Sequence, residues 1–161
     1  MASVGTMKVN AVLADSAVVP ADGKLYIQGG GWNMLWGTAF PMRHPRMCIG
    51  LVITVPWTAT NHNHALDVHL EDGDGQVKKL GDGPEGDVTT IGGTFNIGRP
   101  PVVATGDDQL IAMAMTLDGL EFDHPDRYSF VISIDGTPVN RLPLRVGLVP
   151  NANPLVAGSG I

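Results

Sequence analysis

The chain has 161 residues, of which 43% are hydrophobic, and a formal net charge of −6. This length suits one domain with a full core, while the acidic charge disfavours nucleic acid and anionic membrane surfaces, since both are bound through Lys and Arg. No apolar run approaches the roughly 18 residues of a membrane-spanning helix, so we expect no membrane insertion.

Six Asp-Gly dipeptides separate runs in which apolar and polar residues alternate. Asp-Gly accepts the positive φ angles of tight hairpin turns, and alternation with a period of two is typical of a strand with one buried face. We therefore expect turns at 22–23, 72–73, 74–75, 82–83, 118–119 and 135–136. Strands are predicted, in chain order, at 8–13, 24–27, 46–55, 66–70, 76–80, 88–96, 109–117, 127–134 and 138–148.

The succession of short alternating strands and tight turns predicts an all-β fold, namely an antiparallel two-sheet β-sandwich or jelly roll of about eight to nine strands. The domain is expected to span 7–149 as one unit, preceded by a disordered leader at 1–6. The tail at 150–161 is apolar and nearly uncharged. We expect it to dock on the protein itself or on a partner, with Leu155 and Val156 as contacts.

Two of the predicted strands have distinctive surroundings. The strand at 46–55 is apolar on both faces, which suits a central strand whose second face is covered by a loop or by another subunit. Pro143 cannot donate a hydrogen bond to a neighbouring strand, so the strand at 138–148 is expected at a sheet edge.

An aromatic and methionine cluster follows the glycine run at 29–31, where the missing side chains suggest a bulge or the close approach of another backbone. If 32–36 is extended, Trp32, Met34 and Trp36 project from one face, and Phe40 follows. Such a cluster is typical of a core plug, a sugar-stacking platform or a partner interface. We assign these four residues as candidate partner contacts.

His62 and His64 are the residues with the clearest metal-ligand character, and Asp72 and Asp74 are the nearest candidate carboxylates. A cupin-like metal site needs such a His-x-His pair on a strand together with further convergent ligands. On a continuous strand, however, His69 would point to the opposite side from His62 and His64. A polar loop that leads into a strand therefore explains the same residues.

The loops at 71–75 and 82–87 are rich in carboxylates, and calcium favours several oxygen ligands from adjacent loops. The spacing excludes an EF-hand, because Val77 and Gly83 occupy the positions of its obligatory glycine and terminal glutamate. These loops predict either a calcium-binding β-sandwich adaptor or solvated acidic turns.

Other catalytic patterns receive little support. The run at 81–86 matches a dinucleotide-binding fingerprint by letters, but the residues after it do not predict the helix that this motif requires. The chain lacks a Gly-x-Ser-x-Gly elbow. Its single cysteine, Cys48, lies in an apolar strand where its thiol is expected to be inert. We assign no catalytic residue and no cofactor. The lone cysteine cannot form an internal disulfide, so the fold does not depend on an oxidising compartment. Because the sequence offers neither a convincing secretion signal nor a membrane span, we expect a cytoplasmic protein.

Several short segments carry a resemblance to a known family: Ala14-Asp15-Ser16-Ala17, the run 22–30, Phe40-Pro41 and His44-Pro45. These segments resemble the opening of a family of bacterial single-domain proteins that is catalogued under a domain of unknown function. The resemblance covers the first third of the chain and implies a bacterial origin and a compact β fold. It implies no activity and no catalytic residue.

The sequence thus favours a non-enzymatic assembly or interaction module, homo-oligomeric or bound to another protein. An excess of apolar surface supports this hypothesis: a strand apolar on both faces, an aromatic cluster and an uncharged tail. The alternatives are a cupin-like, metal-dependent enzyme acting on small molecules and the calcium-binding adaptor.

Overall fold

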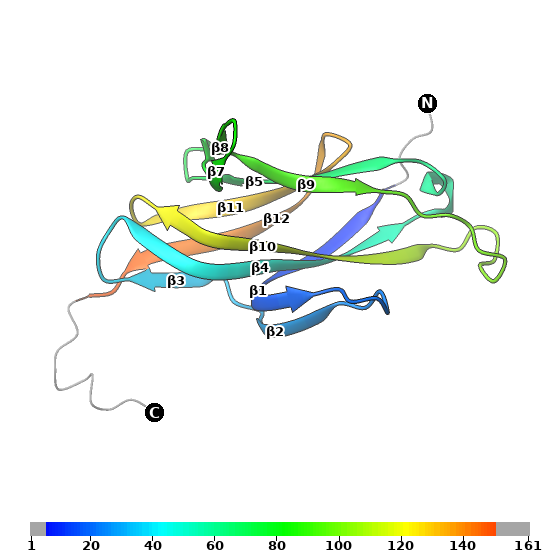
Figure 1. The fold of residues 1–161 in the computed structure, drawn as a ribbon, viewed down its shortest axis with the longest axis horizontal. Coiled ribbons are helices and arrows are strands. Elements are labelled where there is room, and N and C mark those ends of the chain that lie inside the picture. Colours follow the sequence, from blue (N-terminus) through cyan, green and yellow to red (C-terminus); the bar gives the residue numbers. More distant parts are fainter. Residues whose placement is uncertain (1–5, 151–161) are drawn as a thin grey trace.

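The computed structural model of the chain describes residues 6–150. These residues form twelve strands and one short 3-10 helix, η1 (Trp57–Ala59), and no α-helix occurs among them. The strands are β1 (Lys8–Val18), β2 (Tyr26–Gly30), β3 (Met34–Gly37), β4 (Met42–Val55), β5 (His64–Glu71), β6 (Val77–Lys78), β7 (Gly81–Gly83), β8 (Gly86–Val88), β9 (Thr90–Phe95), β10 (Gln109–Phe122), β11 (Asp126–Ile134) and β12 (Thr137–Leu148). The predicted all-β, sandwich-like fold is confirmed (Figure 1).

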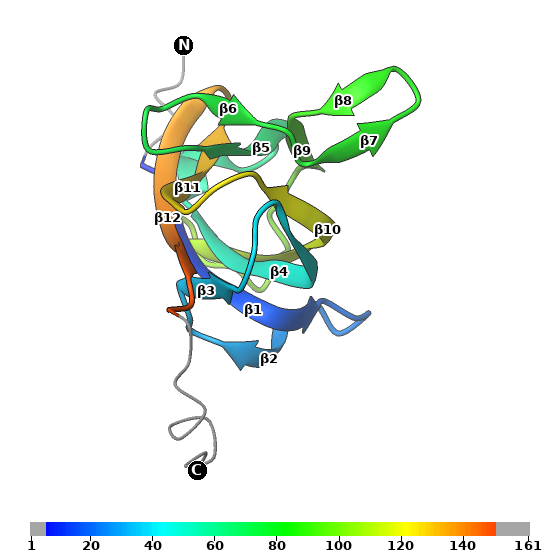
Figure 2. The same cartoon turned by 90° about the vertical axis from the view of Figure 1, so that its left-hand side faces the viewer.

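The strand count exceeds the expected eight or nine because three short strands show no recognisable period-two pattern in the sequence. They are β3 and the pair β7 and β8, which form a separate two-stranded hairpin. Figure 2 shows this hairpin projecting from the body of the molecule. Segments of three or four residues are too short for alternation to be recognised in a sequence.

The first large sheet has the strand order β10-β4-β1-β2, with antiparallel pairing throughout. The predicted central strand, β4, lies between β1 and β10. The second large sheet has the order β3-β12-β11-β5-β6, and β9 also pairs with β5. Its edge strand β3 runs parallel to the end of β12.

Pro143 lies in a strand that is at an edge only along part of its length. Residues Arg145–Leu148 of β12 pair with β3, so this end of the strand is internal. Pro143 precedes that paired stretch and faces Ser129 of β11 on its other side. The edge prediction is therefore correct around the proline and wrong for the end of the strand.

The core lies between the two large sheets. From β4 it receives five side chains that are 0% exposed: Met47, Ile49, Leu51, Ile53 and Val55. The second sheet contributes apolar residues of the same cluster, including Leu66 and Val68 of β5 and Phe130 and Ile132 of β11. The alternation read from the sequence therefore places these residues correctly, because one face of each strand is buried.

The second apolar face of β4 is covered by the same chain. A Cβ atom built on Gly50 would lie 3.3 Å from Cδ1 of Ile27 and 3.4 Å from Cδ1 of Leu25. Cys48, on the same face, is 2% exposed. Leu25, just before β2, and Ile27, within it, thus cover this face around Gly50, whereas Val52 and Thr54 further along β4 are only partly buried.

The Asp-Gly dipeptides do not all turn the chain. Asp135 and Gly136 have φ angles of 52° and 80° and join β11 to β12, as expected for a tight hairpin. Asp118 and Gly119, in contrast, lie inside β10, where Asp118 pairs with Arg46 of β4. The expected turn at 118–119 is therefore wrong; Gly119 adopts a positive φ of 67° without ending the strand.

Candidate functional site

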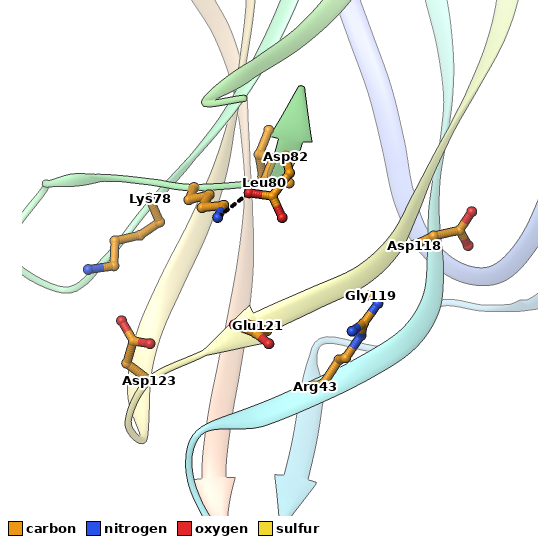
Figure 3. A pocket seen from close by; sticks show the side chains of 10 residues that line it. Arg43, Lys78, Leu80, Asp82, Asp118, Gly119, Glu121 and Asp123 are labelled. Atoms are coloured by element: carbon orange, nitrogen blue, oxygen red, sulfur yellow. Dashed lines mark ion pairs between the residues drawn. The ribbon is translucent and has the colours of Figure 1, made fainter. Parts of the chain in front are cut away.

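The first candidate site is a pocket of about 410 Å³ between the β6–β7 segment and the adjoining ends of β4 and β10 (Figure 3). It is lined by Arg43, Lys78, Lys79, Leu80, Gly81, Asp82, Asp118, Gly119, Glu121 and Asp123. The lining is strongly charged, with three basic and four acidic residues. It contains no Ser, Thr, Cys or His, so it offers no hydroxyl, thiol or imidazole for nucleophilic or acid-base catalysis.

Several charges of this pocket already have ion-pair partners, either within the lining or just outside it. Lys79 Nζ lies 2.5 Å from Asp82 and 3.4 Å from Asp87, and these hydrogen bonds raise the pKa of the lysine. Asp118 accepts a 2.6 Å hydrogen bond from Arg46, which lowers the pKa of Asp118. Arg43 lies across Gly119, which has no side chain to obstruct it (Figure 3). The pocket is therefore better suited to holding its own strands together than to binding a charged ligand.

His64, a predicted metal ligand, is buried and fully engaged. Its Nδ1 lies 2.7 Å from a carboxylate oxygen of Asp135, and its Nε2 lies 2.7 Å from the carbonyl oxygen of Ala59. Both ring nitrogens thus have protein partners, which leaves no lone pair directed at a metal ion. The neighbouring His62 contacts the ring of His64 edge-on, with 6.4 Å between the ring centroids.

The candidate carboxylates lie at the far end of the same strand. Asp72 follows β5, whereas His64 begins it, a separation of about 26 Å for eight residue steps along a strand. The Asp72 carboxylate accepts hydrogen bonds from the backbone of Asp74 and Gln76, which lower its pKa. Within residues 6–150, no three His, Cys, Asp or Glu residues form a group that could hold a metal ion.

A second candidate site lies on the outer face of the second sheet. Met34 and Trp36 project there from β3, with 42% and 52% of their surface exposed. Trp36 lies over Gly147 of the neighbouring strand β12, where any side chain would overlap its ring. Next to this pair, Arg127 of β11 lies directly opposite Arg145 of β12. We call the surface formed by these five residues the Trp36 face.

The two arginines of the Trp36 face are exposed and side by side. Within the described part of the chain neither forms an ion pair, whereas the nearby Arg141 lies 3.2 Å from Glu71. Two shallow hollows of about 440 Å³ each adjoin them, and both are lined by Arg127 and Arg145. The face therefore combines exposed apolar groups with two arginines that have no ion-pair partner among residues 6–150, and Asp126 lines one of the hollows beside them.

The other predicted partner contacts lie elsewhere. Trp32 precedes β3 and packs partly against the core, and its indole N–H donates a 2.8 Å hydrogen bond to the carbonyl of Gly29. Phe40 is also partly buried against the core. Leu155 and Val156 lie outside the described residues. Of the aromatic cluster, only Met34 and Trp36 contribute to the exposed face.

Comparison with known families covers most of the chain. Residues 10–147 match the model of DUF6941, a family of unknown function. The chain belongs to this family. A comparison with curated proteins found no match. In this DUF6941 protein, no helix among residues 6–150 is long and apolar enough to cross a membrane.

The arginine pair of the DUF6941 protein was missed by sequence reasoning. The alternation in both strands does place Arg127 and Arg145 on solvent-facing positions. What alternation does not provide is their cross-strand partner, which depends on the register of the β11–β12 hairpin. The signal that could have drawn attention to them is the scarcity of basic residues: the chain has only ten Lys and Arg, and two of them occupy this one face.

Proposed function

We propose that this protein is a non-enzymatic interaction module whose Trp36 face binds an acidic surface of a partner protein. The observation that carries the proposal is the Arg127–Arg145 pair, placed beside two exposed apolar side chains. Like charges directly opposite each other destabilise a sheet. A carboxylate bound between the two guanidinium groups would remove that repulsion and accept charge-assisted hydrogen bonds.

The composition of the Trp36 face fits a protein partner. Trp, Met and Arg are enriched in protein interfaces, and Trp and Arg are the most frequent energetic hot spots. A polyanion such as nucleic acid would meet the repulsion of a molecule with a net charge of −6. An acidic patch with a hydrophobic centre therefore complements this face best.

The lining of the charged pocket holds no hydroxyl, thiol or imidazole side chain, and this supports the non-enzymatic part of the proposal. No specific observation favours the cupin-like enzyme or the calcium adaptor. We further infer a bacterial source from the resemblance of the opening segment, and a cytoplasmic location from the buried, unpaired thiol of Cys48.

The proposal is tested by site-specific photo-crosslinking in cells, with a crosslinking amino acid in place of Met34 or Trp36. The captured protein is then purified and titrated with the wild type and with variants. We expect Trp36→Ala and Arg145→Glu to weaken binding at least tenfold, and added salt to weaken it as well. Lys24→Glu, a charge reversal on an exposed turn away from this face, serves as the control.

A second variant tests the geometry rather than the charge. Gly147→Val should displace the Trp36 ring and weaken binding, whereas Gly93→Val, on β9 where a side chain meets open space, should not. Unchanged affinity in Trp36→Ala, Arg145→Glu and Gly147→Val would overturn the proposal.

A further inference from the structure

The long strand β10 has an open edge. It forms the border of the first sheet and pairs only with β4. Within residues 6–150, no backbone group of β10 takes part in a hydrogen bond with any element other than β4. Because the groups of alternate residues point to opposite sides of an antiparallel strand, about half of the N–H and C=O groups of β10 face outward without a protein partner.

This edge lacks the features that usually protect an edge strand. Natural proteins place Lys, Pro or a bulge at such positions, or keep the strand short. The segment 109–117 contains no charged residue, no proline and no glycine. The other outer strands of the large sheets are short: β2 has five residues, β3 has four, β6 has two and β9 has six.

The side chains along β10 are also incompletely covered. Ile111, Met113 and Met115 point toward the core but are only partly buried, although their neighbours on β4 are 0% exposed. On the other face, Leu110 is 69% exposed. One more strand beside β10 would satisfy its backbone groups and cover these side chains on both faces.

We propose that this additional strand is β10 of a second copy, paired antiparallel across a twofold axis. An uncharged segment is complementary to an identical uncharged segment, and each copy has one such edge, so the assembly closes as a dimer. Ala112 and Ala114 pair with Val52 and Gly50 of β4, and their short side chains add little bulk on the face of the sheet beside a partner strand.

The dimer is a property separate from the proposed binding of an acidic partner. β10 belongs to the first sheet, whereas the Trp36 face lies on the outer side of the second sheet. Both Trp36 faces would therefore remain free, and the dimer would present two binding surfaces to a partner. Two linked surfaces raise the apparent affinity for a partner that offers two acidic patches.

The ends of the segment give the dimer a distinctive salt dependence. Asp107 and Asp108 precede β10, and Asp118 follows the uncharged stretch. Antiparallel pairing brings the acidic end of each strand near the acidic end of the other. Arg46 compensates Asp118 in part, at 2.6 Å. Added salt screens the remaining repulsion, so salt should strengthen the dimer, whereas it should weaken binding at the Trp36 face.

The test is sedimentation equilibrium of the purified chain, combined with amide hydrogen exchange along β10. We expect a mass of twice 17.0 kDa that increases in population with salt, together with protection of the outward amides of β10. The double variant Ala112→Lys/Ala114→Lys should be monomeric and should lose this protection, since four lysines would meet across the axis. Gln28→Lys, on the opposite edge strand β2, is the matched control.

Circular dichroism first tests whether the double variant is folded, and its mass is interpreted only if it is. If the double variant is unfolded, the variant Thr116→Lys, at an exposed position on the same strand, is used in its place. A wild-type chain that stays monomeric at NMR concentrations would overturn the dimer and leave the Trp36 proposal intact. A dimer whose β10 amides exchange freely would also overturn the proposed β10–β10 pairing. So would a dimer that persists in a folded lysine variant.

Discussion

The imidazole of His64 and the carboxylate of Asp135 form a 2.7 Å ion pair that joins the start of β5 to the β11–β12 turn. The second ring nitrogen of His64 lies 2.7 Å from the carbonyl oxygen of Ala59. Both neighbouring atoms are acceptors, so only the protonated ring can donate from both nitrogens and satisfy both contacts. The other carboxylate oxygen of Asp135 accepts from the backbone N–H of Ala65 at 2.9 Å. One turn residue thus closes a hairpin and holds a buried cation.

This arrangement makes stability depend on pH. Burial acts to lower the pKa of His64, but the hydrogen bonds to Asp135 and Ala59 and the charge of Asp135 outweigh it and raise that pKa. Burial acts to raise the pKa of Asp135, but its bonds to His64 and Ala65 lower it. The contribution of His64 is complete below its unfolded pKa of about 6.5 and is lost as the pH rises through the higher folded value.

We therefore expect His64→Gln to cost about 3 kcal/mol near pH 5–6, at the lower end of the range for broken buried pairs because Asp135 is 32% exposed. The difference between wild type and variant should shrink as the pH rises toward 9. Urea unfolding at a series of pH values measures it. A difference that grows with pH would show that His64 is neutral in the folded protein.

Two adjacent glycines on β9 provide a matched pair for testing the second sheet. A Cβ atom on Gly92 would overlap the backbone carbonyl oxygen of Leu66 on β5, whereas one on Gly93 would meet open space. We expect Gly92→Ala to lower the free energy of unfolding by about 2–3 kcal/mol, since backbone must move. Gly93→Ala should change it by less than about 0.5 kcal/mol. Equal effects in thermal unfolding would contradict the β5–β9 pairing.

The cover of β4 makes a prediction about Cys48. Its Sγ lies 3.4 Å from Oγ1 of Thr116, on the face of β4 that Ile27 covers at Gly50. A thiol reagent should label the native protein only through opening of this cover. Ile27→Ala should accelerate labelling at least tenfold at a stability cost of roughly 1–2 kcal/mol, below the range for a buried isoleucine because Ile27 is 39% exposed. Val18→Ala, an exposed position on β1, should not accelerate it. Rapid labelling of the wild type would show that the second face of β4 is open.

The sequence predicts the elements of this fold better than their partners. Alternation identifies β4, β5, β11 and β12 and the buried side of each, because period two is a local property. It does not show that β3, which follows β2 closely, joins the opposite sheet in parallel with β12. Nor does it separate Asp135-Gly136, which turns the chain, from Asp118-Gly119, which remains in a strand.

The Trp36 face was only half predictable for the same reason. Counting back from the pair Ile134–Thr137 would place Arg127 opposite Leu144. An irregularity between Ile132 and Ser133 shifts the register by one residue and brings Arg127 opposite Arg145. A single extra residue in a strand has no signature in this sequence, although it decides which charges meet. His64 was likewise read as a metal ligand because its partner, Asp135, lies 71 residues away.

The most direct test of the account is an NMR titration of the isotopically labelled protein with a glutamate-rich peptide. We expect chemical-shift changes at the indole N–H of Trp36 and along β11 and β12 around Arg127 and Arg145, and we expect Arg145→Glu to abolish them. Shifts confined to the basic residues of the charged pocket, Arg43, Lys78 and Lys79, or the absence of any shift, would contradict the assignment of the Trp36 face as the binding surface.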